Sequence, residues 1–340
     1  MTGTFRVSLA RVVVARVVIA LSLACVVPAA EAQRYPDRPD VRTFIAEMVE
    51  RHAFPEPALE KLFASVRYQQ AVVTAIAPLP PGMRSWQTYR ANFVNPRRID
   101  AGVQFWRAHA ATLERATRTF GVPPEIVVAI IGVETEYGRN TGSFRVLDAL
   151  ATLAFDYPRR AEYFRSELEQ YLLYTRESRL DAAALKGSYA GAIGIPQFMP
   201  GSIRRFGVDF DGDGRRDLRS SAADAIGSVA NFLASHGWVP GAPVALPARV
   251  EGDAYRGFVD GEVVPIHRAD VLREAGVDFA GVVEPETPCV LIELESPDAA
   301  PVRLVGLQNF YALTRYNRSS FYAAAVNGLA EEIKTAYRPR

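Results

Sequence analysis

Cysteine and histidine are scarce in this chain of 340 residues, which holds two cysteines and four histidines. One cysteine, Cys25, falls in an apolar stretch at the N-terminus, and the other is Cys289. If that stretch is removed as a signal, only Cys289 remains and no intrachain disulfide can form. The histidines are dispersed, and none stands in a zinc-binding spacing such as HExxH. A disulfide framework is therefore excluded, and a zinc enzyme is not indicated.

The chain also lacks an excess of charge and the short motifs of several enzyme classes. Its formal net charge is +1, so no broad basic surface is present and a nucleic-acid partner is not implied. Neither a GxSxG nucleophile elbow nor a phosphate-binding glycine loop occurs. With 49% apolar and 23% charged residues, the composition is that of an ordinary globular protein with one large or several smaller domains.

The first 32 residues have the pattern of a secretory signal peptide. Three arginines precede an apolar stretch at 17–30, and a small-x-small site, Ala30-Glu31-Ala32, lies just before Gln33. The stretch is short for a membrane span, although an uncleaved anchor stays an alternative. The pattern predicts export and a periplasmic location.

Cys25 adds a second possibility for the N-terminus. The sequence Leu23-Ala24-Cys25 resembles a bacterial lipidation site, although Ser22 stands where leucine is usual. The apolar stretch also continues past Cys25 instead of ending there. If Cys25 is lipidated, the protein is an outer-membrane lipoprotein; if the chain begins at Gln33, it is soluble in the periplasm.

Most of the remaining chain has helical periodicity. The predicted helical segments are 42–75, 99–120, 159–176, 220–236 and 319–336. Between 240 and about 305 glycine, proline and valine dominate, and 289–295 has strand character. The sequence predicts a mainly helical (α+β) protein with a small β-rich subdomain inserted near 242–303.

Glu134 is the leading candidate for a catalytic group. It ends the run Ile126 to Glu134, seven apolar residues and a glycine, which follows the helix-starting Val122-Pro123-Pro124. The run predicts a helix buried on nearly all sides, and burial raises the pKa of a carboxyl group. Such a group can donate a proton near neutral pH, as cleavage of a glycosidic bond requires. A structural or solvated glutamate is the plain alternative.

Glu136 could in principle serve as a second acid. Residues two apart on a helix point about 200° away from each other, so Glu134 and Glu136 cannot share a site if the helix continues through both. We therefore expect Glu136 at the surface.

An acidic loop from Asp209 to Asp217 predicts a calcium site. Asp209, Asp211 and Asp213 stand at positions 1, 3 and 5 of an EF-hand pattern, with glycine at position 6. Position 12 is Ser220 where glutamate is usual, and Asp224 could close a longer loop. The alternative is a turn that binds no ion. We expect a structural Ca²⁺, and no cofactor in catalysis.

Three further stretches hold candidate binding residues, each with a structural alternative. Gly187 to Pro200 places Gln197 among small residues and glycines, which suits either hydrogen bonds to sugars or a tight turn. Arg159-Arg160 could bind a carboxylate or simply begin a solvated helix. The aromatic and amide residues of 309–322 suit sugar faces, and core packing suits them equally.

Five quoted segments resemble the lytic murein transglycosylase B family of bacterial cell-wall enzymes. They are VPPEIVVAIIGVET, RVLDALATLAFDYPRRAEYF, LKGSYAGAIGIPQFMP, VDFDGDG and DAIGSVANFLASHGW. The resemblance extends from about residue 38 to the C-terminus and is weakest in the β-rich stretch. It implies a lysozyme-like helical core at 106–241 with an N-terminal helical domain at 33–105, an inserted β domain at 242–303 and a returning segment at 304–340.

The resemblance also implies roles for single residues. Glu134 would be the catalytic acid and base, with Ser188 hydrogen-bonding near it. Further substrate contacts are implied for Tyr89, Gln197, Arg159, Arg160, Asn317 and Tyr322, the two arginines near the peptide stem. Asp209, Asp211, Asp213 and Asp224 would be the calcium ligands. Arg219 departs from the tryptophan that related sequences tend to carry.

The implied reaction is cleavage of the bond between N-acetylmuramic acid and N-acetylglucosamine in peptidoglycan, with formation of 1,6-anhydro ends. Glycan strands are the expected partner, with wall-synthesis proteins as possible further partners. Two alternatives stay open: a hydrolytic muramidase or chitinase, and a non-catalytic wall-binding protein.

Overall fold

A computed structural model describes residues 34–78, 85–259, 261–281, 283–297 and 299–337. The expected signal peptide, its cleavage site and Cys25 lie outside these residues. The described helices are α1 (Pro39–His52), α2 (Glu56–Ala64), α3 (Gln70–Ile76), α4 (Trp86–Phe93), α5 (Pro96–Ala108), α6 (Ala110–Phe120), α7 (Pro124–Thr135), α8 (Val146–Phe155), α9 (Ala161–Glu177), α10 (Pro200–Phe206), α11 (Ala222–Ser235), α12 (Ala269–Glu274), α13 (Gln308–Tyr316) and α14 (Ser320–Ala336).

Short 3-10 helices and strands complete the described elements. The 3-10 helices are η1 (Tyr35–Asp37), η2 (Pro158–Arg160) and η3 (Ala254–Phe258). The strands are β1 (Phe144–Arg145), β2 (Lys186–Gly187), β3 (Ala245–Val250), β4 (His267–Arg268), β5 (Val277–Phe279), β6 (Pro288–Ser296) and β7 (Ala299–Gly306). The mainly helical fold with a small sheet confirms the fold class predicted from the sequence.

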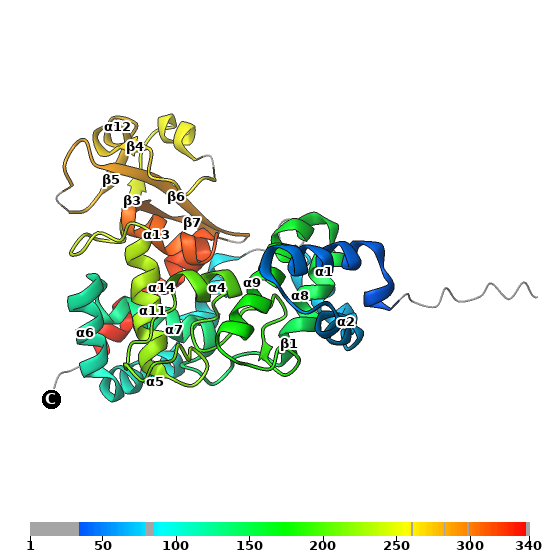
Figure 1. Cartoon of the computed structure of the whole chain (residues 1–340). Coiled ribbons are helices and arrows are strands. Elements are labelled where there is room, and N and C mark those ends of the chain that lie inside the picture. Colours follow the sequence, from blue (N-terminus) through cyan, green and yellow to red (C-terminus); the bar gives the residue numbers. More distant parts are fainter. Residues whose placement is uncertain (1–33, 79–84, 260, 282, 298, 338–340) are drawn as a thin grey trace, which may run out of the picture.

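The larger sheet covers one end of the helical body (Figure 1). Its order is β4-β6-β7-β3-β5, and all described pairs are antiparallel. Helices α4, α13 and α14 lie directly beneath it, while α1 and α2 pack beside α8 and α9 at the far side of the body (Figure 1). The expected domain boundaries at 242 and 303 stay predictions; strand β7 itself continues to Gly306.

Strand β6 joins the sheet to the helices because both of its faces are buried. Cys289 and Leu291 pack into a small core within the sheet subdomain. Val290, Ile292 and Leu294 point to the other face and belong to the main helical core. This division follows from the period of two along a strand. A continuous apolar run, the strand character seen in the sequence, is what such a strand requires.

Helix α7 is the centre of the helical body. Pro124 occupies its first turn, where a missing N–H is harmless, and every residue from Glu125 to Val133 is buried. Helices α5, α6, α11 and α14 pack around it. Each fully buried valine or isoleucine contributes about 1.5–3 kcal/mol. The helix therefore forms a rigid support that ends at the candidate acid, as the apolar run predicts.

One expected helix is two helices in the structure. The periodicity at 99–120 suggests one element, but α5 ends at Ala108 and α6 begins at Ala110. His109 lies between them with φ −122° and ψ 23°, outside the helical region, and its ring contacts Phe105. The segment contains no proline at this point, so the sequence carries no local signal for the break. The prediction of a single helix was wrong.

Among the described residues, no single helix has the length and apolar character needed to cross a membrane. Helices α6 and α7 meet those criteria only as a pair, and the pair is bent by 112°.

Candidate active site

Glu134 lies in the last turn of α7 and is half-buried. The hydroxyl of Tyr322 donates a hydrogen bond to its Oε1 at 2.7 Å. Tyr322 belongs to the first turn of α14, which Ser319 caps by accepting from the backbone N–H of Tyr322. Within the described residues the other carboxylate oxygen of Glu134 has no hydrogen-bond partner. That oxygen is free to carry a transferable proton.

Burial sets the proton affinity of Glu134. It raises the pKa of the carboxyl group from 4.5 to about 7, while the hydrogen bond from Tyr322 opposes this by stabilising the charged form. Near neutral pH both protonation states are populated. Such a carboxyl can donate a proton and then accept one without a large barrier for either step.

Three tyrosines lie close enough to the Glu134 carboxyl group for its charge to affect their pKa values. Burial, and to a smaller extent the negative charge of Glu134, raise the pKa of Tyr89 to about 12. The same two causes raise the pKa values of Tyr316 and Tyr322 well above the ordinary value. Tyr316 and Tyr322 stack with their ring planes 15° apart, and the Tyr316 hydroxyl donates to the Pro196 carbonyl at 2.5 Å. The site therefore combines one acid with an uncharged aromatic wall.

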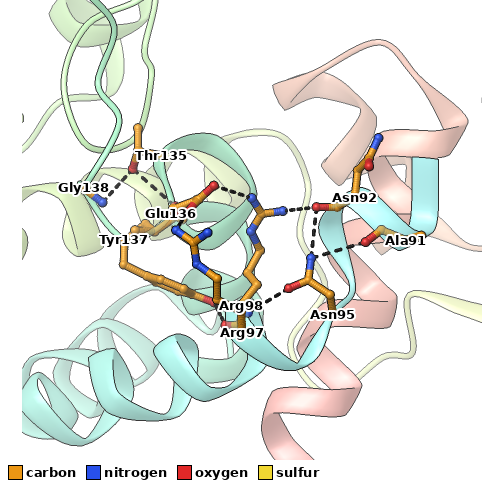
Figure 2. Close-up of polar contacts among 10 residues, drawn as sticks. Ala91, Asn92, Asn95, Arg97, Arg98, Thr135, Glu136, Tyr137 and Gly138 are labelled. Atoms are coloured by element: carbon orange, nitrogen blue, oxygen red, sulfur yellow. Dashed lines mark hydrogen bonds and ion pairs between the residues drawn. The ribbon is translucent and has the colours of Figure 1, made fainter. Parts of the chain in front are cut away.

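Glu136 is held away from this site by two arginines (Figure 2). Helix α7 ends at Thr135, and Glu136 adopts a left-handed conformation with φ 50°. Its two carboxylate oxygens pair with Arg97 and Arg98, each at 3.1 Å. Its side chain is 37% exposed, and the structure gives it no hydrogen bond to Glu134 in the described residues. The two glutamates do not share a site, as expected. The reason differs from the expected one, because the chain reverses direction after Thr135 and the helix does not continue through Glu136.

The chain after Glu134 turns back through three residues with positive φ. Glu136, Tyr137 and Gly138 have φ values of 50°, 64° and 85°. The Tyr137 ring returns over α7, where a Cβ on Gly132 would lie 2.5 Å from the phenol oxygen. That close approach requires glycine at 132. The Tyr137 hydroxyl then donates to the Arg98 carbonyl at 2.8 Å (Figure 2).

Thr135 links the end of α7 to the glycine-rich stretch. Its hydroxyl donates to the Ile195 carbonyl at 2.8 Å and accepts from the Gly138 N–H at 2.9 Å. The stretch is a tight turn, and Gly194 approaches Leu218 so closely that a Cβ would lie 2.4 Å from its carbonyl oxygen. Helix α7 and this turn are therefore fixed to each other directly beside Glu134.

Ser188 and Gln197 make local contacts in this turn. The Ser188 Oγ accepts from the Ala192 N–H at 3.0 Å, and no hydrogen bond joins it to Glu134 in the described residues. Gln197 has φ 50°, and its amide nitrogen donates to the Thr141 and Gly194 carbonyls. The Ser188 proton and the Gln197 carbonyl oxygen stay available for a ligand. Substrate binding by both residues stays a prediction.

The other expected contact residues come from three separate parts of the chain. Tyr89 lies on α4, and Asn317 is exposed just after α13. Arg159 and Arg160 are exposed in η2, with the Arg160 guanidinium 4.4 Å from the ring centre of Tyr163. Neither arginine contacts Glu134 in the structure. The stretch 309–322 includes Tyr316. No local spacing in the sequence indicates that Tyr316 lies beside Glu134.

The acidic loop gathers three of the four expected metal ligands. Carboxylate oxygens of Asp209, Asp211 and Asp213 lie within 4.8 Å of one another. Ca²⁺ binds oxygen ligands at 2.3–2.6 Å, so such a set fits around one ion. Asp224 is 1% exposed, and its oxygens accept from the backbone N–H groups of Phe210 and Asp217 at 2.7 and 2.8 Å. Asp224 does not join the cluster here, and its role as a ligand stays a prediction.

Comparisons with known proteins identify close relatives. A family model described as a transglycosylase SLT domain matches residues 36–331. The chain is 40% identical over 311 residues to membrane-bound lytic murein transglycosylase B of Escherichia coli (strain K12), covering 89% of this chain and 84% of that protein. The crystal structure of catenated lytic transglycosylase SltB1 from Pseudomonas aeruginosa superposes with a TM-score of 0.85 at 44% identity, covering 89% of this chain and 100% of that one.

Two related structures contain bound groups. Escherichia coli Slt35 in complex with calcium is 39% identical with a TM-score of 0.80, and covers 88% of this chain and 94% of its own. Pseudomonas aeruginosa SltB3 in complex with NAG-anhNAM-pentapeptide is 30% identical with a TM-score of 0.75, and covers 88% and 80%. The resemblance found in the sequence is confirmed over nearly all of the described chain.

Proposed function

The chain belongs to the transglycosylase SLT domain family, and from this premise we propose that it cleaves peptidoglycan strands as a lytic transglycosylase with Glu134 as acid and base. The observation that carries the proposal is the buried carboxyl of Glu134, with a pKa of about 7 and a hydrogen bond from Tyr322. The pentapeptide-bearing anhydro sugar bound to the SltB3 relative supports the same substrate class.

In the first step Glu134 acts as a general acid. Its proton passes to the oxygen that links N-acetylmuramic acid to N-acetylglucosamine, and the C1–O bond breaks as the leaving sugar takes that proton. The Tyr322 hydroxyl stabilises the carboxylate that Glu134 becomes. A positive charge develops at C1, opposite the new carboxylate.

In the second step Glu134 acts as a base. It takes the proton from the C6 hydroxyl of the same muramic sugar, whose oxygen forms the new bond to C1. The product is a 1,6-anhydro ring, Glu134 is again protonated, and no water is consumed. Because the attacking hydroxyl is part of the same sugar, no second carboxylate is needed to activate water.

The remaining residues would bind the strand. Ser188 would donate its free hydroxyl proton near the reacting sugar, and Gln197 would accept through its carbonyl oxygen. Tyr89 and Asn317 would line the path of the glycan. Arg159 and Arg160 would lie near the peptide stem. The buried Tyr322 would act chiefly by hydrogen-bonding Glu134.

The acidic loop would bind a structural Ca²⁺. Asp209, Asp211 and Asp213 would supply oxygens, with Asp224 closing the loop from α11. The Slt35 complex with calcium supports this assignment. The ion would neutralise three clustered carboxylates and hold the loop against α11, with no part in bond cleavage.

The proposed location is the bacterial cell envelope. The secretory pattern of the first 32 residues supports export to the periplasm, and the membrane-bound Escherichia coli relative agrees with an envelope location. Intact mass of the mature protein separates a chain that begins at Gln33 from one lipidated at Cys25.

Mass analysis of digested peptidoglycan tests the reaction. We expect the wild-type enzyme to release fragments with 1,6-anhydro-muramic ends, and Glu134→Gln to release them roughly 10³-fold more slowly. Reducing ends would identify a hydrolytic muramidase and contradict the proposal. Equal release of fragments by wild type and variant would show that Glu134 is not the catalytic acid. If neither protein released fragments, the result would favour the alternative of a non-catalytic wall-binding protein.

A further inference from the structure

A cavity adjoins the aromatic wall beside Glu134. Its volume is about 770 Å³, within the usual range of ligand pockets. It lies between α4, the junction of α13 and α14, and residues 261–264 of the sheet subdomain. Figure 1 shows these helices beneath the sheet. Glu134 does not line this cavity, so it is separate from the point of bond cleavage.

Two helix faces form opposite walls. Ser85, Tyr89 and Asn92 are spaced at i, i+4 and i+7 and therefore share one face of α4. Tyr311 and Arg315 share one face of α13 by the same rule. Both walls present hydrogen-bonding groups, unlike the apolar faces that pack against a core. The walls are suited to a polar ligand.

Tyr89 connects the cavity with the active site. Its phenol lines the cavity, and it also lies close enough to Glu134 for the charge of that carboxylate to act on it. A side branch of a polymer bound across Glu134 can therefore reach the cavity along Tyr89.

The charged residues that line the cavity are two arginines and one acid, Glu262, so positive charge is in excess there. Arg315 and Arg318 line it, and within the described residues neither guanidinium has an ion pair or a hydrogen bond to an acceptor. The Arg315 guanidinium lies 5.6 Å from the ring centre of Tyr311. By contrast Arg303, in the nearby sheet, pairs with Glu293 at 2.6 Å. Guanidinium groups bind carboxylates in a bidentate manner, and these two retain that capacity.

We propose that this cavity binds a carboxylate-bearing peptide branch of the glycan strand, with Arg315 and Arg318 contacting its carboxylates. The inference rests on the proposed function for its choice of polymer. It assigns a peptide-binding site to α13 and to the junction of α13 with α14, a site that Arg159 and Arg160 do not line, although Arg160 and Arg318 both lie close enough to Tyr163 to act on its charge. Cleavage would then favour strands that still carry their peptides.

The test compares one soluble tetrasaccharide of the strand with and without its peptides. We expect Arg315→Gln to raise KM for the peptide-bearing tetrasaccharide about five- to tenfold, which is the effect of losing one partly exposed hydrogen bond between charged groups. For the tetrasaccharide without peptides, kcat and KM should stay unchanged. Arg318→Gln should act in the same way. Arg107→Gln, an exposed arginine of α5 outside the cavity, is the matched control and should change neither.

Binding to a Glu134→Gln background tests the site without catalysis. Calorimetry should show a Kd for the peptide-bearing tetrasaccharide five- to tenfold weaker when Arg315→Gln is added, with equal melting temperatures. The inference would be overturned if the arginine variants weakened binding of both tetrasaccharides equally. It would also be overturned if neither Arg315→Gln nor Arg318→Gln changed the binding of either tetrasaccharide. If wild type forms no anhydro product, the proposed function fails, while this Kd comparison still decides the role of Arg315.

Discussion

At the scale of single residues, Glu134 makes stability depend on pH. Its pKa is about 7 in the folded chain against an ordinary 4.5. Between these values the folded chain holds a proton that the unfolded chain gives up, so the free energy of unfolding falls as pH rises through this window and stays low above it. The active site is thus built at the expense of stability at neutral pH.

Glu134→Gln should therefore be more stable than wild type at pH 8. Below pH 4.5 the glutamate is protonated in both states, and the two proteins should melt at similar temperatures. The gain in stability over wild type should appear between pH 4.5 and 7 and should persist above pH 7. Thermal melts followed by circular dichroism at pH 4, 6 and 8 measure it; a gain of equal size at all three values would contradict the role of the proton.

Tyr322→Phe should shift the pH dependence of the reaction. The lost hydrogen bond stabilises the carboxylate, so its removal raises the pKa of Glu134 above about 7. The protonated form then persists to higher pH, and the alkaline limb of kcat/KM should move up by about one unit. Tyr68→Phe, at an exposed tyrosine in the loop before α3, is the control. A lowered rate with an unmoved alkaline limb would show that the hydroxyl acts only on packing.

At the scale of elements, the acidic loop and helix α11 form one unit. Asp224 in the first turn of α11 holds the loop backbone, while Asp209, Asp211 and Asp213 face one another. Three clustered carboxylates repel one another unless a cation lies between them.

A chelator should lower the melting temperature of wild type, and Asp211→Ala should abolish most of this effect. Calcium bound only to the folded chain stabilises it by mass action, and the variant loses one ligand. Melting curves with EGTA and with added calcium measure the difference. Asp253→Ala, an exposed acid of the sheet subdomain, should respond to EGTA as wild type does. An unchanged wild-type curve under EGTA would exclude a structural ion.

Local patterns predicted some elements and not others. The apolar run and paired prolines were sufficient for α7 and its terminal Glu134, and the strand character of 289–295 indicated β6. The break at His109 depends on how α5 and α6 pack, which no local residue signals. The contact of Glu134 with Tyr322 joins residues 188 apart in sequence, so only the folded chain could reveal it. Likewise the approach of Arg98 to Glu136 depends on the left-handed turn after α7.

At the scale of the whole molecule, β6 makes the sheet and the helices one cooperative structure. Its alternate residues belong to the two cores. Ile292→Ala should lower the free energy of unfolding by about 2–5 kcal/mol, because it leaves a cavity between the sheet and the helical body. Urea unfolding followed separately by tryptophan fluorescence and circular dichroism should give coincident transitions. Two separate transitions in wild type would show that the sheet unfolds on its own.

The pairing of Glu134 with Tyr322 also has a consequence for biosynthesis. The acid is made before half of the chain is complete, whereas its hydrogen-bond partner arrives with the last long helix, after the whole sheet. A nascent or truncated chain that ends before Ser319 has neither the phenol beside Glu134 nor the helix that covers α7. The order of elements along the chain thus completes the proposed bond-cleaving site only when nearly the whole chain is present.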